Sequence, residues 1–216
     1  MFGSIKRLIG AGAQSNKAAH VLANWAKSEG HAFKHVKHAG GKGYAVESAA
    51  GWRVEWGTSQ RPYIVGSELR FRCETGVEPD VQMVLLTKVL AQTLESDVFS
   101  RYTNAMQTQV DTSLPDEMRW LAIHPKVSVA ESATLNRRFT LLCNAGELAK
   151  KWFDASLIEA FDRAADCWWS DALVLVITLN RGMLTARMSG QPLEVAQLKL
   201  VGELFSCLAD RLRAAA

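Results

Sequence analysis

Histidines gather near the start of the chain, and histidine is the side chain that most often binds a transition metal or exchanges a proton near neutral pH. Four of the five lie in the first 42 residues: His20, His31, His35 and His38. If residues 31–38 form a strand, His31 and His35 project from one face. A transition-metal site usually needs about three converging ligands, and Lys34 and Lys37 place positive charge between these imidazoles. We therefore predict a solvated basic strand and no metal site.

Other patterns with known chemistry fail at defined positions. Gly41 and Lys42 resemble the end of a phosphate-binding loop, but Gly43 stands where magnesium binding needs Ser or Thr, and Val36 stands at the first glycine. The chain contains no GxSxG elbow, HExxH helix, EF-hand loop or GxGxxG fingerprint. The sequence therefore predicts no catalytic residue and no cofactor.

The cysteines are widely spaced, with no CxxC pair: Cys73, Cys143, Cys167 and Cys207. Each has apolar neighbours, so we predict four reduced thiols that act as small core side chains rather than a zinc site or a disulfide framework. Trp52 and Trp56 should pack in the core, whereas of the adjacent Trp168 and Trp169 at least one should reach the surface, because neighbouring residues of an extended chain face opposite ways.

Charge is distributed unevenly along the chain. The first 42 residues hold seven basic residues and one acid, a balance of +6, whereas the other 174 hold 18 basic and 21 acidic residues. Such a segment could contact anionic lipid, nucleic acid or the acidic remainder of the same protein, or simply form a solvated surface. The predicted contacts with an anionic surface are Lys6, Arg7, Lys17, Lys34, Lys37 and Lys42.

Period-two alternation predicts an antiparallel meander in the first half of the chain. Trp52, Val54 and Trp56 should face the core, and Arg53 and Glu55 should face water. The expected strands are Tyr44–Ser48, Trp52–Thr58, Tyr63–Val65 and Leu69–Glu74, preceded by a strand over 31–38. A deeply buried helix should follow, from Pro79 to Ser96.

The flanking regions are predicted to hold further helices and strands. Phe2, Ile5, Leu8 and Ile9 share one helical face, so we expect a short amphipathic helix, a glycine-containing hinge over 10–13 and a second helix from Ser15 to Gly30. In the second half, helices should begin near Ser156, with Glu159 completing a capping box, and near Pro192. The expected strands are 118–123, 126–130, 138–143, 172–179 and 183–188.

These elements predict an α+β fold, a largely antiparallel sheet meander with packed helices. We expect a basic helical arm over 1–30, the meander and its helix over 31–100, and a second strand-and-helix half over 114–216 packed on the first, with a single compact unit as the alternative. Leu69–Leu94 and Leu184–Leu208 both read as strand, turn and long helix, which a duplication or chance would explain.

The predicted function is that of a non-enzymatic cytoplasmic binding or regulatory protein whose basic N-terminal arm contacts an anionic surface or a protein partner. Cytoplasmic location follows from the absence of a secretory signal pattern in MFGSIKRLIGAGAQ and of an apolar run near 20 residues. Two alternatives stay open. One is a small enzyme whose site is assembled from residues distant in sequence, and the other is a structural subunit of a homo-oligomer.

Overall fold

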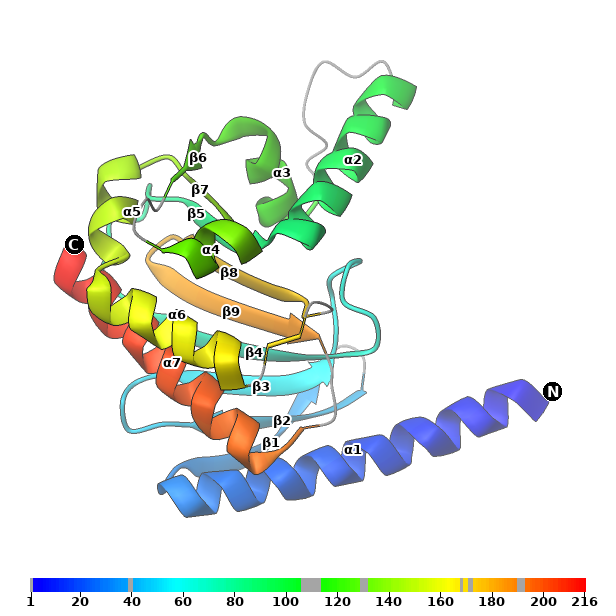
Figure 1. The fold of residues 1–216 in the computed structure, drawn as a ribbon. Helices are drawn as coiled ribbons and strands as arrows, with labels where there is room; N and C mark the ends of the chain where they lie inside the picture. Colours follow the sequence, from blue (N-terminus) through cyan, green and yellow to red (C-terminus); the bar gives the residue numbers. More distant parts are fainter. Residues whose placement is uncertain are drawn as a thin grey trace.

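The computed structural model describes residues 2–38, 41–105, 114–128, 132–167, 169–170, 173–189 and 193–216. The α+β fold predicted from the sequence is confirmed: one nine-stranded antiparallel sheet has helices packed on it (Figure 1). The strand order is β1-β2-β3-β4-β9-β8-β5-β7-β6. Strands from both halves of the chain therefore share one sheet, in which β5 of the first half lies between β8 and β7 of the second. The division into separate halves stays a prediction.

The strands begin and end close to many of the predicted positions. Their bounds are β1 (Ala32–His38), β2 (Gly41–Glu47), β3 (Arg53–Thr58), β4 (Ser67–Glu74), β5 (Met83–Thr87), β6 (Lys126–Val127), β7 (Phe139–Cys143), β8 (Leu175–Asn180) and β9 (Met183–Ser189). The β8–β9 hairpin turns at Arg181 and Gly182, whose positive φ values of 51° and 71° suit the tight turn that the glycine predicts.

Seven helices lie within the described residues. Their bounds are α1 (Phe2–Glu29), α2 (Lys88–Ala105), α3 (Asp116–Ile123), α4 (Ala133–Arg138), α5 (Gly146–Trp152), α6 (Ala155–Cys167) and α7 (Val195–Ala215). α6 and α7 confirm the predicted closing helices, although Asp154, and not a capping box from Ser156 to Glu159, caps α6 by accepting a 2.9 Å hydrogen bond from the Leu157 amide.

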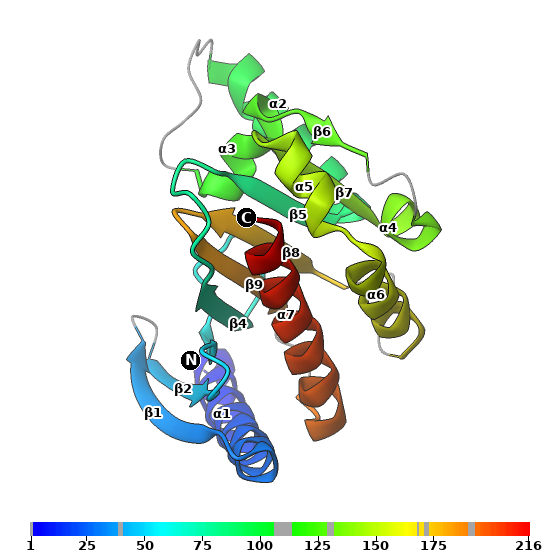
Figure 2. The ribbon, with the colours of Figure 1, turned by 90° about the vertical axis from the view of Figure 1, so that its left-hand side faces the viewer.

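One face of the sheet carries the main core, over which α1, α7 and α4–α6 pack (Figure 2). The predicted core face of β3 is confirmed, because Trp52, Val54 and Trp56 are only 5%, 1% and 5% exposed. Trp52 stacks on Trp25 of α1 at a centroid distance of 5.8 Å and donates its indole N–H to Ser206 Oγ of α7 at 2.9 Å. This tryptophan therefore joins the N-terminal and C-terminal helices through the sheet.

The opposite face of the sheet has two parts. Over β5, β7 and β8 it is apolar, and α2 and α3 cover it in a second cluster that includes Val84, Leu86 and Met118. Over β3, β4 and β9 the same face carries charged side chains instead. Strands buried on one face alone show alternating apolar and polar residues, whereas strands buried on both faces have continuous runs of apolar residues.

That distinction explains the wrong prediction of a helix from Pro79 to Ser96. The apolar run Met83–Leu86 of this segment belongs to β5, which lies between β7 and β8 and is buried on both faces. α2 starts only at Lys88. A short apolar run without alternation has the same pattern in a buried strand as in a buried helix, which is why the prediction fails here. Leu69–Leu94 thus contains β5 as well as β4 and the start of α2, whereas Leu184–Leu208 contains only β9 and α7.

Five further predictions are wrong in whole or in part. The predicted hinge over 10–13 is part of one continuous helix, because a glycine in a helix interior costs only about 1 kcal/mol and does not by itself end the helix. Residues 118–123 form α3, not a strand, and 63–65 lie in the loop before β4. Of the strand over 126–130, only Lys126–Val127 is a strand, and 129–130 lie outside the described residues. Glu55 does not face water: it is 8% exposed.

Candidate anionic-surface site

The basic N-terminal segment is built on α1, whose second half packs on the sheet. Ala18, Leu22, Trp25 and Ala26 are buried against the main core, and Ser15 Oγ lies 2.9 Å from the Tyr44 hydroxyl of β2. Before Ser15, α1 continues past the edge of the sheet (Figure 1). The 13 helical residues from Phe2 to Gln14 span about 20 Å at the α-helical rise.

The far end of α1 is fixed to the body of the protein. Lys199 of α7 forms an ion pair with Glu29 at 2.8 Å, and His31 after the helix donates its backbone N–H to the Ala26 carbonyl at 2.8 Å. Bound at one end and projecting at the other, α1 holds its N-terminal half at a set angle to the sheet. A short helix joined to a second helix by a hinge over 10–13, as the sequence predicted, would not do this.

The structure divides the six predicted anion-contacting residues among several places. Lys17 is exposed on α1, and Lys37 is exposed on β1 opposite Lys42 of β2. Lys34 forms an ion pair with Glu47 at 2.6 Å, and as an even-numbered residue of β1 it lies on the other face of the strand from Lys37. The side chains of three of the six lie outside the described part: Lys6, Arg7 and Lys42.

His31, which directly precedes β1, and His35 of β1 pack on aromatic rings. His31 lies edge-on to Trp25 and Trp52 at centroid distances of 5.6 and 5.0 Å, and His35 packs in the same way on Phe33 and Tyr44. They share one strand face, as predicted, but that face is turned toward aromatic residues. Within the residues that the structure describes, no three His, Cys, Asp or Glu side chains gather as a metal site would require.

Two cysteines fit the prediction of core thiols and one does not. Cys73 and Cys143 are buried, and burial raises the pKa of Cys73 to about 11 and also raises that of Cys143. Cys207 is half buried, whereas Cys167 at the end of α6 is exposed, so its predicted core position is wrong. Of the two adjacent tryptophans, Trp169 is buried and Trp168 lies outside the described residues.

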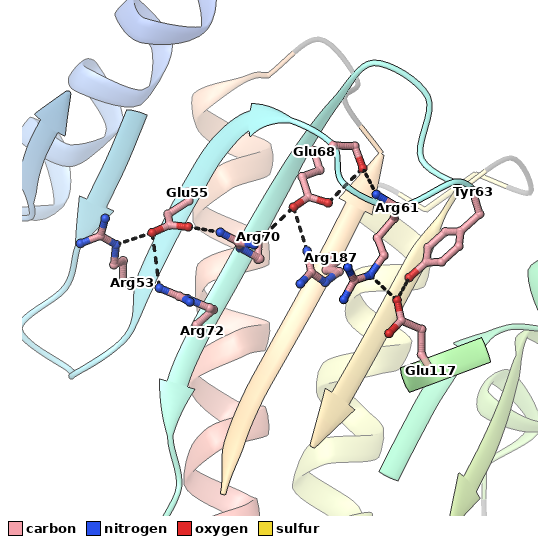
Figure 3. A network of polar contacts seen from close by, with 10 residues as sticks. Arg53, Glu55, Arg61, Tyr63, Glu68, Arg70, Arg72, Glu117 and Arg187 are labelled. Carbon is pink, nitrogen blue, oxygen red and sulfur yellow. Dashed lines mark hydrogen bonds and ion pairs between the residues drawn. The ribbon is translucent and has the colours of Figure 1, made fainter. Parts of the chain in front are cut away.

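Sequence reasoning missed a network of arginines and glutamates on the charged part of the sheet (Figure 3). Glu55 of β3 accepts hydrogen bonds from Arg53 Nε at 2.8 Å, from Arg70 Nη2 and from Arg72 Nη2 at 3.4 Å. Burial alone would raise the pKa of Glu55, but the hydrogen bond from Arg70 and the surrounding guanidinium charges outweigh it and hold the pKa below its usual value.

A second carboxylate continues the network onto β9. Glu68 accepts from Arg187 Nη1 at 2.8 Å and from Ser59 Oγ at 3.1 Å, and Arg70 Nη1 lies 3.7 Å away. Arg70 and Arg187 stand directly opposite each other on β4 and β9, a cross-strand placement of like charges that is unfavourable without a counter-charge. Glu68 supplies that counter-charge.

A third carboxylate ties the loop between β3 and β4 to α3. Glu117, in the first turn of α3 and only 3% exposed, accepts from Arg61 Nε and from the Tyr63 hydroxyl. Burial and the nearby carboxylate raise the pKa of Tyr63, so its hydroxyl stays a donor at neutral pH. Since Glu55, Glu68 and Glu117 each accept from at least two donors, the network is suited to holding strands and loop in place rather than to proton transfer.

Comparisons with known proteins inform the fold alone. No family model matches the chain, and no curated protein matches its sequence. A solved structure with a similar fold is the crystal structure of the mycobacterial trehalose monomycolate transport factor A, TtfA. It is 10% identical, the match covers 90% of this chain and 94% of that chain, and the TM-score is 0.52.

Proposed function

We propose that the protein is a non-enzymatic binding protein that docks on an anionic lipid surface through the projecting half of α1. The observation that carries the proposal is the continuity of α1, which is held by its second half and extends past the sheet with its first (Figure 1). Within the described residues, no helix has both the length and the apolar composition to cross a membrane. The proposed attachment is therefore peripheral.

Lipid is favoured over nucleic acid by the composition of the projecting segment. It combines Lys6 and Arg7 with the apolar residues Phe2, Ile5 and Ile9. An interfacial helix uses both kinds of residue, because its cations are attracted to anionic headgroups while its apolar residues enter the acyl boundary. Nucleic acid would use the cations alone. The structural neighbour's description as a transport factor for trehalose monomycolate is compatible with a lipid context, but at 10% identity it supports the fold only.

Co-sedimentation with vesicles tests the proposal. The full-length protein should bind vesicles containing phosphatidylserine at low salt. It should bind them less at physiological salt, because the charges are screened, and should not bind vesicles of pure phosphatidylcholine. Since each cation near an anionic surface contributes about 1 kcal/mol, the double substitution Lys6→Gln/Arg7→Gln should weaken binding more than tenfold. Lys150→Gln/Lys151→Gln on α5 removes the same charge elsewhere and should leave binding nearly unchanged.

Deletion of residues 2–13 completes the test. Vesicle binding should be lost while the melting temperature stays within a few degrees of the full-length value, because the N-terminal half of α1 extends past the sheet (Figure 1). Failure of the full-length protein to bind anionic vesicles at low salt would overturn the proposal. So would equal binding by the two double variants, or a gel shift of a nucleic-acid probe without vesicle binding.

A further inference from the structure

The sheet ends in two edge strands of different length. β6, the last strand on one side, has only two residues, whereas β1 on the other side has seven. Among the described strands β1 pairs with β2 alone, and it lies at the margin of the sheet, with α1 on the face toward α7 (Figure 2). The long edge of the sheet is therefore that of β1.

The outer edge of β1 carries backbone groups that the sheet leaves unpaired. In an antiparallel pair, every second residue points its N–H and C=O groups at the partner strand, and the residues between them point these groups away. β1 stays in register with β2 from Ala32 opposite Glu47 to His38 opposite Gly41, so no bulge interrupts this pattern. Within the described residues no other strand pairs with the outward groups, which can therefore accept a further strand.

The two edges are protected against chance pairing in different ways. Natural sheets use short edge strands, prolines, bulges or charged side chains, and lysine above all. β6 is short. β1 is long and has neither proline nor bulge, so its protection comes from Lys34 and Lys37, which are both exposed. β1 contains no acid to offset them.

These lysines determine which kind of strand can be added. Two copies of β1 paired with each other would bring four lysines onto one seam, and like charges facing across strands are unfavourable. A strand with acids opposite Lys34 and Lys37 would instead gain from both cross-strand pairs. Lys37 forms no ion pair with a described residue, and Lys34 pairs with Glu47 at the surface, where its side chain is 54% exposed. Both ammonium groups can therefore reach a new carboxylate.

Two apolar residues of β1 lie beside the lysines. Phe33 and Val36 are half buried, and Phe33 stacks on Tyr44 of β2 at a centroid distance of 5.9 Å. Because side chains alternate along a strand, Lys37 shares the face of Phe33, and Lys34 shares the face of Val36. Each face of the edge thus offers one apolar and one cationic side chain. A complementary strand carries an apolar residue and an acid on each of its faces.

We propose that β1 binds an extended acidic segment of another protein, which adds a further strand to the sheet. Backbone hydrogen bonds to β1 hold the segment, as in other cases of strand addition. Carboxylates opposite Lys34 and Lys37 select acidic over basic segments, and apolar side chains lie opposite Phe33 and Val36. The contact is separate from the proposed membrane contact, because it uses β1 and not the projecting half of α1.

NMR titration of the full-length protein with short blocked peptides tests the proposal. Run antiparallel to β1, the probe Thr-Glu-Val-Thr-Glu-Val-Thr places its glutamates opposite Lys37 and Lys34 and its valines opposite Val36 and Phe33. At saturation it should shift the amide signals of residues 32–38 and slow hydrogen exchange of alternate amides there at least tenfold. A probe with lysine in place of both glutamates should bind at least tenfold more weakly. Failure of the glutamate probe to bind at millimolar concentration, or equal binding by the lysine probe, overturns the proposal.

Methylation of the peptide backbone separates strand pairing from charge attraction. Two versions of the glutamate probe carry N-methyl groups on alternate residues, one at the odd and one at the even positions. Only one of these sets of amides faces β1 in an antiparallel pair, so one version should bind at least tenfold more weakly than the other. Equal affinities of the two versions would mean that charge alone holds the peptide, and would overturn the strand addition.

Charge reversal locates the site. Lys34→Glu/Lys37→Glu should weaken binding of the glutamate probe at least tenfold and make the lysine probe the tighter ligand. Lys150→Glu/Lys151→Glu, the same reversal on α5, should leave both affinities within twofold. An unchanged preference for the glutamate probe in Lys34→Glu/Lys37→Glu overturns the site.

Two further measurements separate this contact from other uses of the same region. Deletion of residues 2–13 should leave binding of the glutamate probe within twofold while vesicle binding is lost, so the two proposals can fail independently. Light scattering of the unaltered protein should show no dimer that the glutamate probe disperses. Such a dimer would assign the edge of β1 to a second copy of the chain and overturn the acidic partner.

Discussion

The arginine–glutamate network and the basic segment of α1 and β1 are both rich in cations, but they differ in how those cations are paired. In the network, Arg53 and Arg70 face Glu55, and Arg187 faces Glu68. In the basic segment, Lys17 and Lys37 are exposed and form no ion pair with any residue that the structure describes. The pairing of the charges therefore ranks the basic segment above the network as a binding site.

The difference follows from where the charges lie in the sheet. β3, β4 and β9 have no helix of the α2–α3 cluster over their charged face, so cross-strand neighbours there must neutralise one another. A buried ion pair gains little over an apolar pair, but loss of one partner leaves a charge without compensation. The network should therefore matter for stability, and the basic segment for binding.

Removal of Glu68 should give the largest effect. Glu68→Ala leaves Arg187, whose side chain is 11% exposed, without its carboxylate partner. It also removes one of the two carboxylates that pair with Arg70, Glu68 and Glu55. Breaking a buried pair in this way typically costs about 3 to 5 kcal/mol of unfolding free energy, measured by urea denaturation. Glu74→Ala, at the exposed end of β4, is the matched control and should cost less than about 0.5 kcal/mol. Similar losses in the two variants would contradict a stabilising role for the network.

The sequence correctly predicted strands that have one apolar and one polar face, such as β3. Trp52, Val54 and Trp56 alternate with polar residues, and the alternation places β3 correctly. β5 shows no alternation because both of its faces are covered, and it was assigned to a helix. Period-two alternation appears only where one face of a strand is buried and the other is exposed. It therefore cannot identify a strand such as β5, whose two faces are both buried.

The candidate sites were predictable to a lesser degree. Alternation identifies Glu55 as opposite to the core face, but only the pairing of β3 with β4 brings Arg70 beside it. Arg187 meets Glu68 across 119 residues of sequence, which no local pattern encodes. The network therefore could not be found before the strand order was known.

The second expected effect of the network, smaller than that of Glu68→Ala, is a decrease in the free energy of unfolding at acid pH. The pKa of Glu55 is lowered in the folded state, so its contribution is fully present above the ordinary pKa of 4.5 and is lost as the pH falls through the folded-state value. Below pH 4.5 the unfolded chain takes up the proton more readily, and stability must therefore decrease. Urea unfolding between about pH 6 and pH 3 should show a shallower decrease for Glu55→Gln than for the unaltered protein.

Glu147→Gln is the control for this titration. Glu147 is exposed on α5 and its pKa is lowered by a hydrogen bond from Lys150, an interaction that solvent screens. Its substitution should change the pH profile less than that of Glu55. Parallel profiles for Glu55→Gln and the unaltered protein would show that Arg70 and its neighbours do not favour the charged form of Glu55.

The smallest effect is expected at Lys34, where pairing and surface binding compete directly. Lys34 is 54% exposed and bonded to Glu47, whose other oxygen accepts from Arg53 Nη1 at 2.8 Å. Exposed pairs contribute less than about 1 kcal/mol, so Lys34→Gln should barely change the free energy of unfolding. Lys17 is exposed on α1 and forms no ion pair with a described residue. If pairing decides which cations bind, Lys17→Gln should weaken co-sedimentation with anionic vesicles more than Lys34→Gln, although each removes one charge. Equal losses would mean that net charge, and not the pairing of individual side chains, governs the contact.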